Sequence, residues 1–218
     1  ICDAIWGTFA YPFYLGELEY TKDEVAFASK FFGIGAIVLG LAIGGWMLTA
    51  LGRMFTLLFG GLLAALTNLL YADMALGGRT MAAVAESTGF AALVSSFPGG
   101  SPKLATLMVT IGGENLAIGI AGAAFVAWLS SIVSKQFSAV QYALLSSLTL
   151  LIGALGRGAL GQMIERQGYY DVFILTTWIG VAAMVLVAFE WWRQARSANS
   201  GVVTPEAPSA AVAAVPAE

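Results

Sequence analysis

The sequence from Gly113 to Arg157 reads GENLAIGIAGAAFVAWLSSIVSKQFSAVQYALLSSLTLLIGALGR, two long apolar segments around a short polar break at 134–138. A transmembrane helix needs about 20 residues at about 1.5 Å per residue, and each segment is long enough. Because a charge inside the bilayer costs about 3 kcal/mol or more, polar groups there normally face a protein interior or a water-filled cavity. We interpret the two segments as half of a solute pathway. Their polar groups are Glu114, Asn115, Gln141 and Arg157.

The composition predicts a membrane protein. Of the 218 residues, 59% are hydrophobic and only 11% are charged, whereas about a quarter of the residues in a soluble domain are charged. Such a chain cannot cover itself with a polar surface. The formal net charge of −3 gives no reason to expect a nucleic-acid partner.

Missing residue types exclude several classes of chemistry. There is no His, which excludes His-based metal sites and Ser/His or Cys/His catalysis within the chain. The single Cys2 cannot form an internal disulfide, and no phosphate-binding GxxxxGK(S/T) loop is present. We therefore expect no enzyme activity, no catalytic residues, no metal and no cofactor. The chain begins with Ile inside an apolar run, which favours a piece of a longer gene product over a signal peptide.

Apolar runs separated by polar breaks predict an all-α membrane protein with a bundle of six transmembrane helices over residues 1–192. Thr21 is the predicted N-cap of the second helix, with Glu24 completing a capping box. Gly40 and Gly44 have the spacing that lets two helix backbones approach closely in lipid. The expected spans are about 1–15, 23–50, 54–74, 103–133, 138–164 and 170–192.

Two stretches fall outside these spans. The loop 75–102 is interrupted by charges, and we interpret it as an interfacial helix or lid. The tail 193–218 has no periodic pattern and is predicted to be disordered. Within the loop, four apolar residues fall at i, i+3, i+4 and i+7, the stripe of an amphipathic helix: Phe90, Leu93, Val94 and Phe97.

Loop charges leave the orientation of the chain in the membrane open. Six spans place both ends on one side, and Lys and Arg are then balanced at four on each side, so the positive-inside rule does not decide. One side has Arg53, Lys135, Arg193 and Arg196, and the other has Lys22, Arg79, Lys103 and Arg166.

The order of residues in the quoted stretch carries a family resemblance that includes its polar positions. It resembles the late helices of the AmpG muropeptide permeases, in the peptide–acetyl-coenzyme A transporter group of the major facilitator superfamily. Residues 1–192 can be laid on the C-terminal six helices of that family. The matching parts are Glu114-Asn115-Leu116, AAFVA at 123–127, Lys135-x-Phe137-Ser138-Ala139-x-Gln141, ALLS at 143–146 and Gly156-Arg157.

The resemblance implies a twelve-helix fold in two six-helix halves, with the substrate between them near the membrane midplane. This chain would be the C-terminal half, and its partner the N-terminal half of the same polypeptide. The implied activity is proton-driven import of N-acetylglucosaminyl-anhydro-N-acetylmuramyl peptides across the bacterial inner membrane, in peptidoglycan recycling and β-lactamase induction. The implied partners are a muropeptide or another small anionic solute, protons and membrane lipid. The side with Arg53, Lys135 and the tail would be cytoplasmic.

Two carboxylates and an amide are candidates for proton or substrate binding. Glu114 lies near the middle of its span, and Asp3 lies within the first one; ionisable groups at membrane depth are functional by default. Each could instead be a structural carboxyl that is hydrogen-bonded to a neighbouring helix. Asn115 could contact sugar or amide groups, or it could tie two helices together.

Two cations and a glutamine complete the candidate binding residues. Lys30 and Arg157 could bind an anionic substrate, with Arg able to clamp a carboxylate through two hydrogen bonds. The alternative is that they reach the membrane interface or pair with an acid. Gln141 lies close to the polar break and is more often a hydrogen-bonding residue at a helix end.

A conformational loop is expected between the second and third spans. Residues 45–53 resemble a degraded form of the superfamily loop at this place, with Gly45, Gly52 and Arg53 as candidates. The pattern has Asp and Arg where this chain has Thr49 and Ala50, so a latching role has weak support.

Two further functions fit the same residues. One is a transporter of acetyl-coenzyme A or another anionic metabolite, because paired cations would suit phosphates. The other is a membrane-embedded enzyme or a non-transporting scaffold. An enzyme needs clustered nucleophiles, bases or ligands, which are not visible, whereas a scaffold would tolerate loss of its intramembrane charges.

Overall fold

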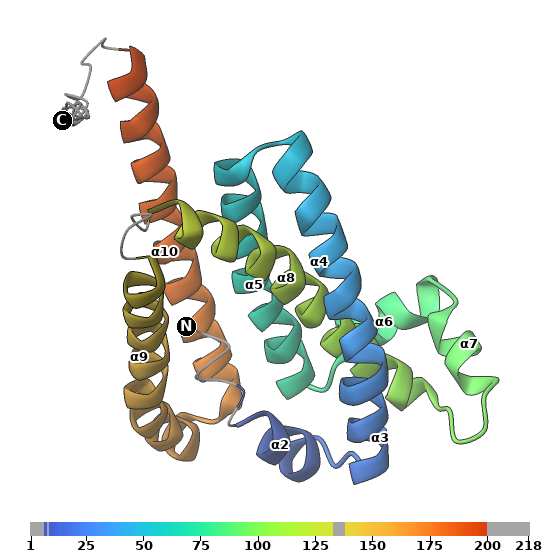
Figure 1. The fold of residues 1–218 in the computed structure, drawn as a ribbon. Coiled ribbons are helices and arrows are strands. Elements are labelled where there is room, and N and C mark those ends of the chain that lie inside the picture. Colours follow the sequence, from blue (N-terminus) through green and yellow to red (C-terminus); the bar gives the residue numbers. More distant parts are fainter. Residues whose placement is uncertain (1–6, 8, 133–137, 200–218) are drawn as a thin grey trace, which may run out of the picture.

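The computed structural model describes residues 7, 9–132 and 138–199, and every element within them is helical (Figure 1). Asp3, Lys135 and the first part of the first expected span (residues 1–6 and 8) lie outside the described residues. The elements are α2 (Ala10–Pro12), η1 (Phe13–Glu17), α3 (Lys22–Ala26), η2 (Phe27–Phe32), α4 (Gly33–Ala50), α5 (Arg53–Ala75), α6 (Arg79–Ser87), α7 (Phe90–Ser95), α8 (Pro102–Ile132), α9 (Ser138–Gln167) and α10 (Tyr169–Asn199), where η denotes a π-helical turn.

Four helices in the described part of the chain are long and apolar enough to cross a membrane. They cover Lys22–Ala50, Arg53–Ala75, Pro102–Ser131 and Tyr169–Arg193. The chain is therefore an all-α, multi-pass membrane protein. Helix α9 is as long as these, with 30 residues, but several of its side chains lie outside the description. The bundle of six spans stays a prediction.

The start of the first described span follows the predicted capping chemistry. The backbone N–H of Glu24 donates to Oγ1 of Thr21 at 3.3 Å, and the backbone N–H of Thr21 donates to the Glu24 carboxylate at 2.9 Å. This reciprocal pair satisfies two backbone donors that a helix start leaves without partners. The predicted capping box is confirmed.

Helix α8 is the centre of the bundle and packs against α4, α5, α6 and α7. Glycines bring the backbones into direct contact. A Cβ atom built on Gly40 would overlap the carbonyl oxygen of Leu116, and one built on Gly60 would lie 2.9 Å from Cα of Ala121. At Gly44 the same atom would lie 3.0 Å from Cβ of Ala123. The small-residue spacing therefore places α4 on α8, as close helix contact in lipid requires.

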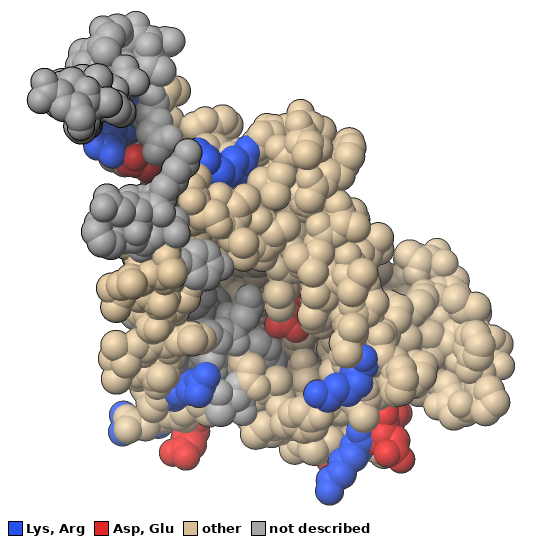
Figure 2. All heavy atoms as spheres, viewed as in Figure 1, with Lys and Arg blue, Asp and Glu red and all other residues tan. Residues whose placement is uncertain are grey.

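The surface divides into a wide apolar band and two charged ends. Figure 2 shows lysines, arginines and acids gathered mostly at the two ends of the helices, with uncharged residues between them. Large apolar side chains are exposed on the described helices, among them Trp46, Leu155 and Leu186. The α4–α5 connection, with Arg53, lies at the same end as the C-terminus of α10 (Figure 1). This distribution is what a bilayer core between two aqueous phases selects.

Two local expectations differ from the structure. Helix α10 continues to Asn199, although the tail was expected to be disordered from residue 193. Two contacts stabilise these added turns. Glu190 and Arg193 form an ion pair of 2.8 Å, and the Arg196 guanidinium lies 3.8 Å from the centre of the Trp192 ring. Residues 200–218 lie outside the described part.

The expected stripe of the 75–102 loop is divided between two environments. Val94 is buried with α8, whereas Leu93 and Phe97 are exposed. The reason is that α7 ends at Ser95, so Phe97 has no helical turn to place it above Val94. The loop forms two short helices, α6 and α7, at the end of the bundle opposite the C-terminus of α10 (Figure 1).

Candidate functional site

A chain of hydroxyl groups ends on the carboxylate of Glu114, near the middle of α8. The phenol of Tyr71, on α5, donates a hydrogen bond to Oε2 of Glu114. The phenol of Tyr14, on η1, donates to the hydroxyl of Tyr71 at 3.0 Å. Tyr71 is completely buried and Tyr14 is 5% exposed, while Glu114 is partly buried. Three segments far apart in the sequence therefore converge on one carboxylate.

The tyrosine hydroxyls are enclosed by aromatic rings. Phe173, on α10, stacks on Tyr71 with ring centroids 5.5 Å apart, and Phe13 meets the edge of Tyr71 at 6.4 Å. Phe13 and Phe173 contact each other at 5.2 Å. Because these rings offer no strong hydrogen-bonding groups, the bonds between the two phenols and to Glu114 run through an apolar surrounding.

The position of Tyr14 depends on an uncommon backbone turn. It lies in η1, a π-helical turn, and its carbonyl accepts a hydrogen bond from the backbone N–H of Tyr20 at 2.9 Å. Such turns are rare and are often found at functional sites. A second π-helical turn, η2, carries Lys30.

Asn115 is adjacent to Glu114 but makes a different kind of contact. Its Nδ2 donates to the carbonyl of Ile111 in the same helix at 2.7 Å. Gly33 of α4 lies against this amide, because a Cβ on Gly33 would be 3.1 Å from the same nitrogen. The hydrogen bond of Asn115 thus runs within α8, and its amide meets α4 through packing against Gly33.

The candidate cations lie on different flanks of the bundle. Lys30 is exposed on η2, which packs with α4 and α8, and Arg157 is exposed on α9, which packs mainly on α10. Figure 1 shows α9 and α4 on opposite sides of α8. In Figure 2 the surface is hollowed between these two sides, and an acidic group lies at the edge of the hollow, away from the charged ends. Gln141 is partly exposed in the first turn of α9.

The candidate conformational residues lie at the α4–α5 turn. Gly52 has a φ of 83° and precedes α5 as its N-cap, a backbone conformation that favours glycine. Arg53 is exposed at the first position of α5, and Gly45 has open space where a side chain would be. Only Gly52 is required by backbone geometry.

Tyr14 and Tyr71 were not among the residues that the sequence pattern singled out. Both carry a hydroxyl group within an apolar segment, and this was the signal in the sequence that could have identified them. Aromatic residues in such segments, however, more often contribute to packing than to ligand binding. Within the described ranges 7, 9–132 and 138–199, no group of three His, Cys, Asp or Glu residues could hold a metal ion.

Comparison with curated proteins finds relatives over most of the chain. A protein named putative transporter AmpG 4, from Rickettsia conorii, is 27% identical over 187 residues, which are 86% of this chain and 39% of the relative. A protein of the same name from Rickettsia felis is 28% identical over 187 residues. The protein named anhydromuropeptide permease, from Escherichia coli, is 23% identical over 185 residues, which are 85% of this chain and 33% of the relative. No protein-family model matches the chain.

The chain is thus AmpG-like over most of its length, as the resemblance in its residues predicted. It spans less than two fifths of the length of these relatives. The relatives are named as transporters or permeases and not as enzymes.

Proposed function

We propose that this chain is the C-terminal half of a major-facilitator-type transporter in the bacterial inner membrane. The transporter imports anhydromuropeptides, cell-wall recycling products that carry a short peptide, and the proton gradient drives it. The similarity to transporters named AmpG supports the substrate class. The observation that carries the mechanism is the hydrogen-bonded carboxylate of Glu114 inside a membrane-length helix.

Glu114 is the proposed proton-binding group. A carboxylate at membrane depth is costly, and it persists where it binds ions, protons or substrate. Its contact with Tyr71 gives it a hydrogen-bond donor from a second helix, and a charged acceptor makes this bond stronger than one between neutral groups. The charged form of Glu114 therefore ties α8 to α5.

Protonation of Glu114 changes its hydrogen bond with Tyr71. A neutral carboxyl is a weaker acceptor than a carboxylate and becomes a donor itself. Binding of a proton would weaken the bond from Tyr71 and, through Tyr14, the connection to η1. The proton would thus bias the packing of three segments, which is how a ligand shifts a two-state equilibrium.

The substrate-binding groups are proposed on both flanks of the hollow. Lys30 and Arg157 are exposed cations on opposite sides of α8, so each could meet a different anionic group of a large solute. Asp3 and Gln141 complete this proposed set, with Asp3 as a second proton-binding carboxylate. The turn with Gly45, Gly52 and Arg53 is proposed to move when the halves rock, on the cytoplasmic side.

The test uses the full-length protein in proteoliposomes. We expect anhydromuropeptide uptake to rise when the outside is made acidic, and uptake that ignores an imposed pH gradient would exclude proton coupling. Acetyl-coenzyme A is the competing substrate, and preferential uptake of it would replace the muropeptide assignment. A non-transporting scaffold would keep its cellular phenotype after Glu114→Gln, Lys30→Gln and Arg157→Gln are combined.

A further inference from the structure

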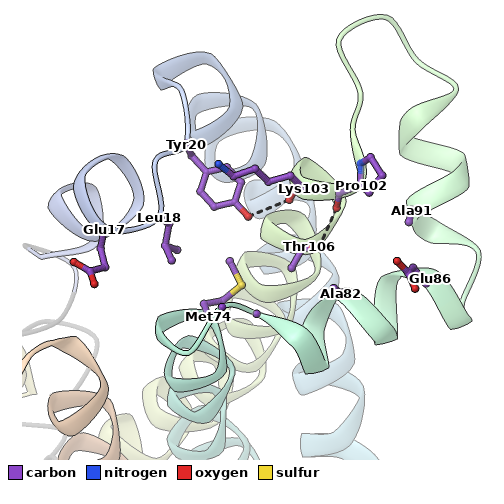
Figure 3. Close-up of a pocket in the computed structure, with 12 residues that line it drawn as sticks. Glu17, Leu18, Tyr20, Met74, Ala82, Glu86, Ala91, Pro102, Lys103 and Thr106 are labelled. Atoms are coloured by element: carbon purple, nitrogen blue, oxygen red, sulfur yellow. Dashed lines mark hydrogen bonds between the residues drawn. The ribbon is translucent and has the colours of Figure 1, made fainter.

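A separate pocket lies at the end of the bundle where η1, α5, α6, α7 and α8 meet. Its volume is about 420 Å³, within the range of about 300–1,000 Å³ that small-molecule sites occupy. Figure 3 shows its walls: Leu18 follows η1, Met74 lies in the last turn of α5, and Lys103 lies in the first turn of α8. The α6–α7 segment, interpreted from the sequence as an interfacial helix or lid, closes the far side.

The pocket combines an apolar floor with charges of both signs at its rim. Met74 and Ala91 are buried, and they give the floor its apolar surface. Glu17, Glu86 and Lys103 are exposed side chains that line the rim. Figure 3 places Glu17 and Glu86 on opposite sides, with Lys103 between them. A ligand that complements this rim carries both an ammonium and a carboxylate.

The ammonium of Lys103 is held in place by its neighbours. Its Nζ donates to the carbonyl oxygen of Glu19 at 2.9 Å and lies 4.6 Å from the centre of the Tyr20 ring. The Tyr20 hydroxyl donates to the backbone carbonyl of Lys103 at 3.0 Å (Figure 3). An ammonium has three N–H donors, so the bond to Glu19 leaves capacity for a ligand carboxylate.

The backbone beside this lysine is strained. Glu19 has a φ of 52°, in the left-handed region that residues other than glycine seldom adopt. This conformation belongs to the residue whose carbonyl accepts the bond from Lys103. Strain of this kind is concentrated at active sites and ligand-binding sites.

We propose that this pocket binds a small zwitterionic solute, such as a short peptide with a free amine and a free carboxylate. The carboxylate contacts Lys103, the amine contacts Glu86 on one side of it, and the side chains cover Met74 and Leu18. Leu18 is four residues from Tyr14, and Met74 is three from Tyr71, so the pocket adjoins the chain that ends on Glu114. Its role as an entry site for peptide-bearing solutes rests on the proposed function, whereas the binding itself does not.

The test is calorimetric titration of purified full-length protein with the dipeptide alanyl-alanine. Two blocked probes, N-acetyl-alanyl-alanine and alanyl-alanine amide, each remove one charge. We expect saturable binding of the zwitterion and a loss of about two- to five-fold with either blocked probe, as removal of one ion-pair partner at an exposed rim predicts. No saturable binding, or equal affinity for all three, overturns the proposal.

Two variants assign the charges. Lys103→Gln should weaken binding of alanyl-alanine but leave the affinity for alanyl-alanine amide unchanged, because the amide has no carboxylate. Glu86→Gln should weaken binding of alanyl-alanine but leave the affinity for N-acetyl-alanyl-alanine unchanged, because that probe has no ammonium. Lys22→Gln and Glu165→Gln are matched controls, because both residues are exposed outside the pocket. Equal losses in controls and pocket variants would contradict the site. If the protein binds the dipeptide but shows no proton-coupled uptake, the proposed pocket is supported and the proposed transport function is contradicted.

Discussion

Tyr71 and Glu114 are 43 residues apart in sequence and are joined by a hydrogen bond across the interface between α5 and α8. The donor is completely buried, and Tyr14 of η1 donates to it in turn. The three segments η1, α5 and α8 therefore share one chain of hydrogen bonds that ends on a carboxyl group. The predictions below test this chain and the packing that supports it.

The change Glu114→Gln should abolish the dependence of uptake on the pH gradient. The glutamine amide does not bind a proton near neutral pH, yet its oxygen can still accept a hydrogen bond from Tyr71. We expect at least about ten-fold slower gradient-driven uptake, within the range for a lost intramembrane charge contact. The measurement is uptake into proteoliposomes with and without an imposed gradient. Glu165→Gln, at an exposed position of α9, is the control, and wild-type coupling in Glu114→Gln would remove Glu114 from the mechanism.

The change Tyr71→Phe should weaken the tie between α5 and α8 while keeping the ring stack with Phe173. The phenylalanine fills the same space but removes the hydroxyl that accepts from Tyr14 and donates to Glu114. A lost bond to a charged group costs about 1.5–3 kcal/mol. The readouts are the thermal midpoint of the purified protein and the pH profile of uptake. Tyr11→Phe, an exposed tyrosine, controls for loss of a hydroxyl, and an unchanged pH profile in Tyr71→Phe would reduce Tyr71 to a packing residue.

Stability should fall at alkaline pH through Tyr20. Burial, with a smaller contribution from the Glu24 carboxylate, raises the pKa of Tyr20 from 10.0 to about 12. Because the folded protein keeps the phenol proton that the unfolded chain loses, this contribution is present below pH 10.0 and is lost as the pH rises toward about 12. The thermal midpoints of wild type and Tyr20→Phe should therefore differ below pH 10.0, and the difference should shrink as the pH rises toward about 12. A constant difference between the two proteins over that range would contradict the prediction.

Substitutions of two glycines on α4 should have opposite effects. Gly40→Ala adds a methyl group that overlaps the Leu116 carbonyl of α8, whereas Gly35→Ala places it in open space. We expect Gly40→Ala to destabilise by about 1–3 kcal/mol through overpacking. Gly35→Ala should be neutral or stabilise by up to about 1 kcal/mol, because Ala favours helix. Thermal midpoints check both, and equal midpoints would show that the α4–α8 contact is not tight.

The sequence predicted the class and the local chemistry well, and the interactions between distant segments poorly. The Thr21–Glu24 capping box was readable because its residues are three apart, and Gly40 with Gly44 was readable because lipid allows few ways of packing helices. Glu114 was readable because a carboxylate in an apolar segment is rare. Its partner Tyr71 was not, since nothing local shows toward which neighbour a helix turns a phenol.

The amino-acid sequence by itself determined that this is a helical membrane protein, because apolar length and the energetic cost of charge in hydrocarbon depend only on composition and spacing. It also carried the likeness to the AmpG permeases. Only the tertiary structure decided that Glu114 faces two tyrosines while the adjacent Asn115 bonds within its own helix. Neighbouring residues on a helix point about 100° apart, so their partners depend on how whole helices pack.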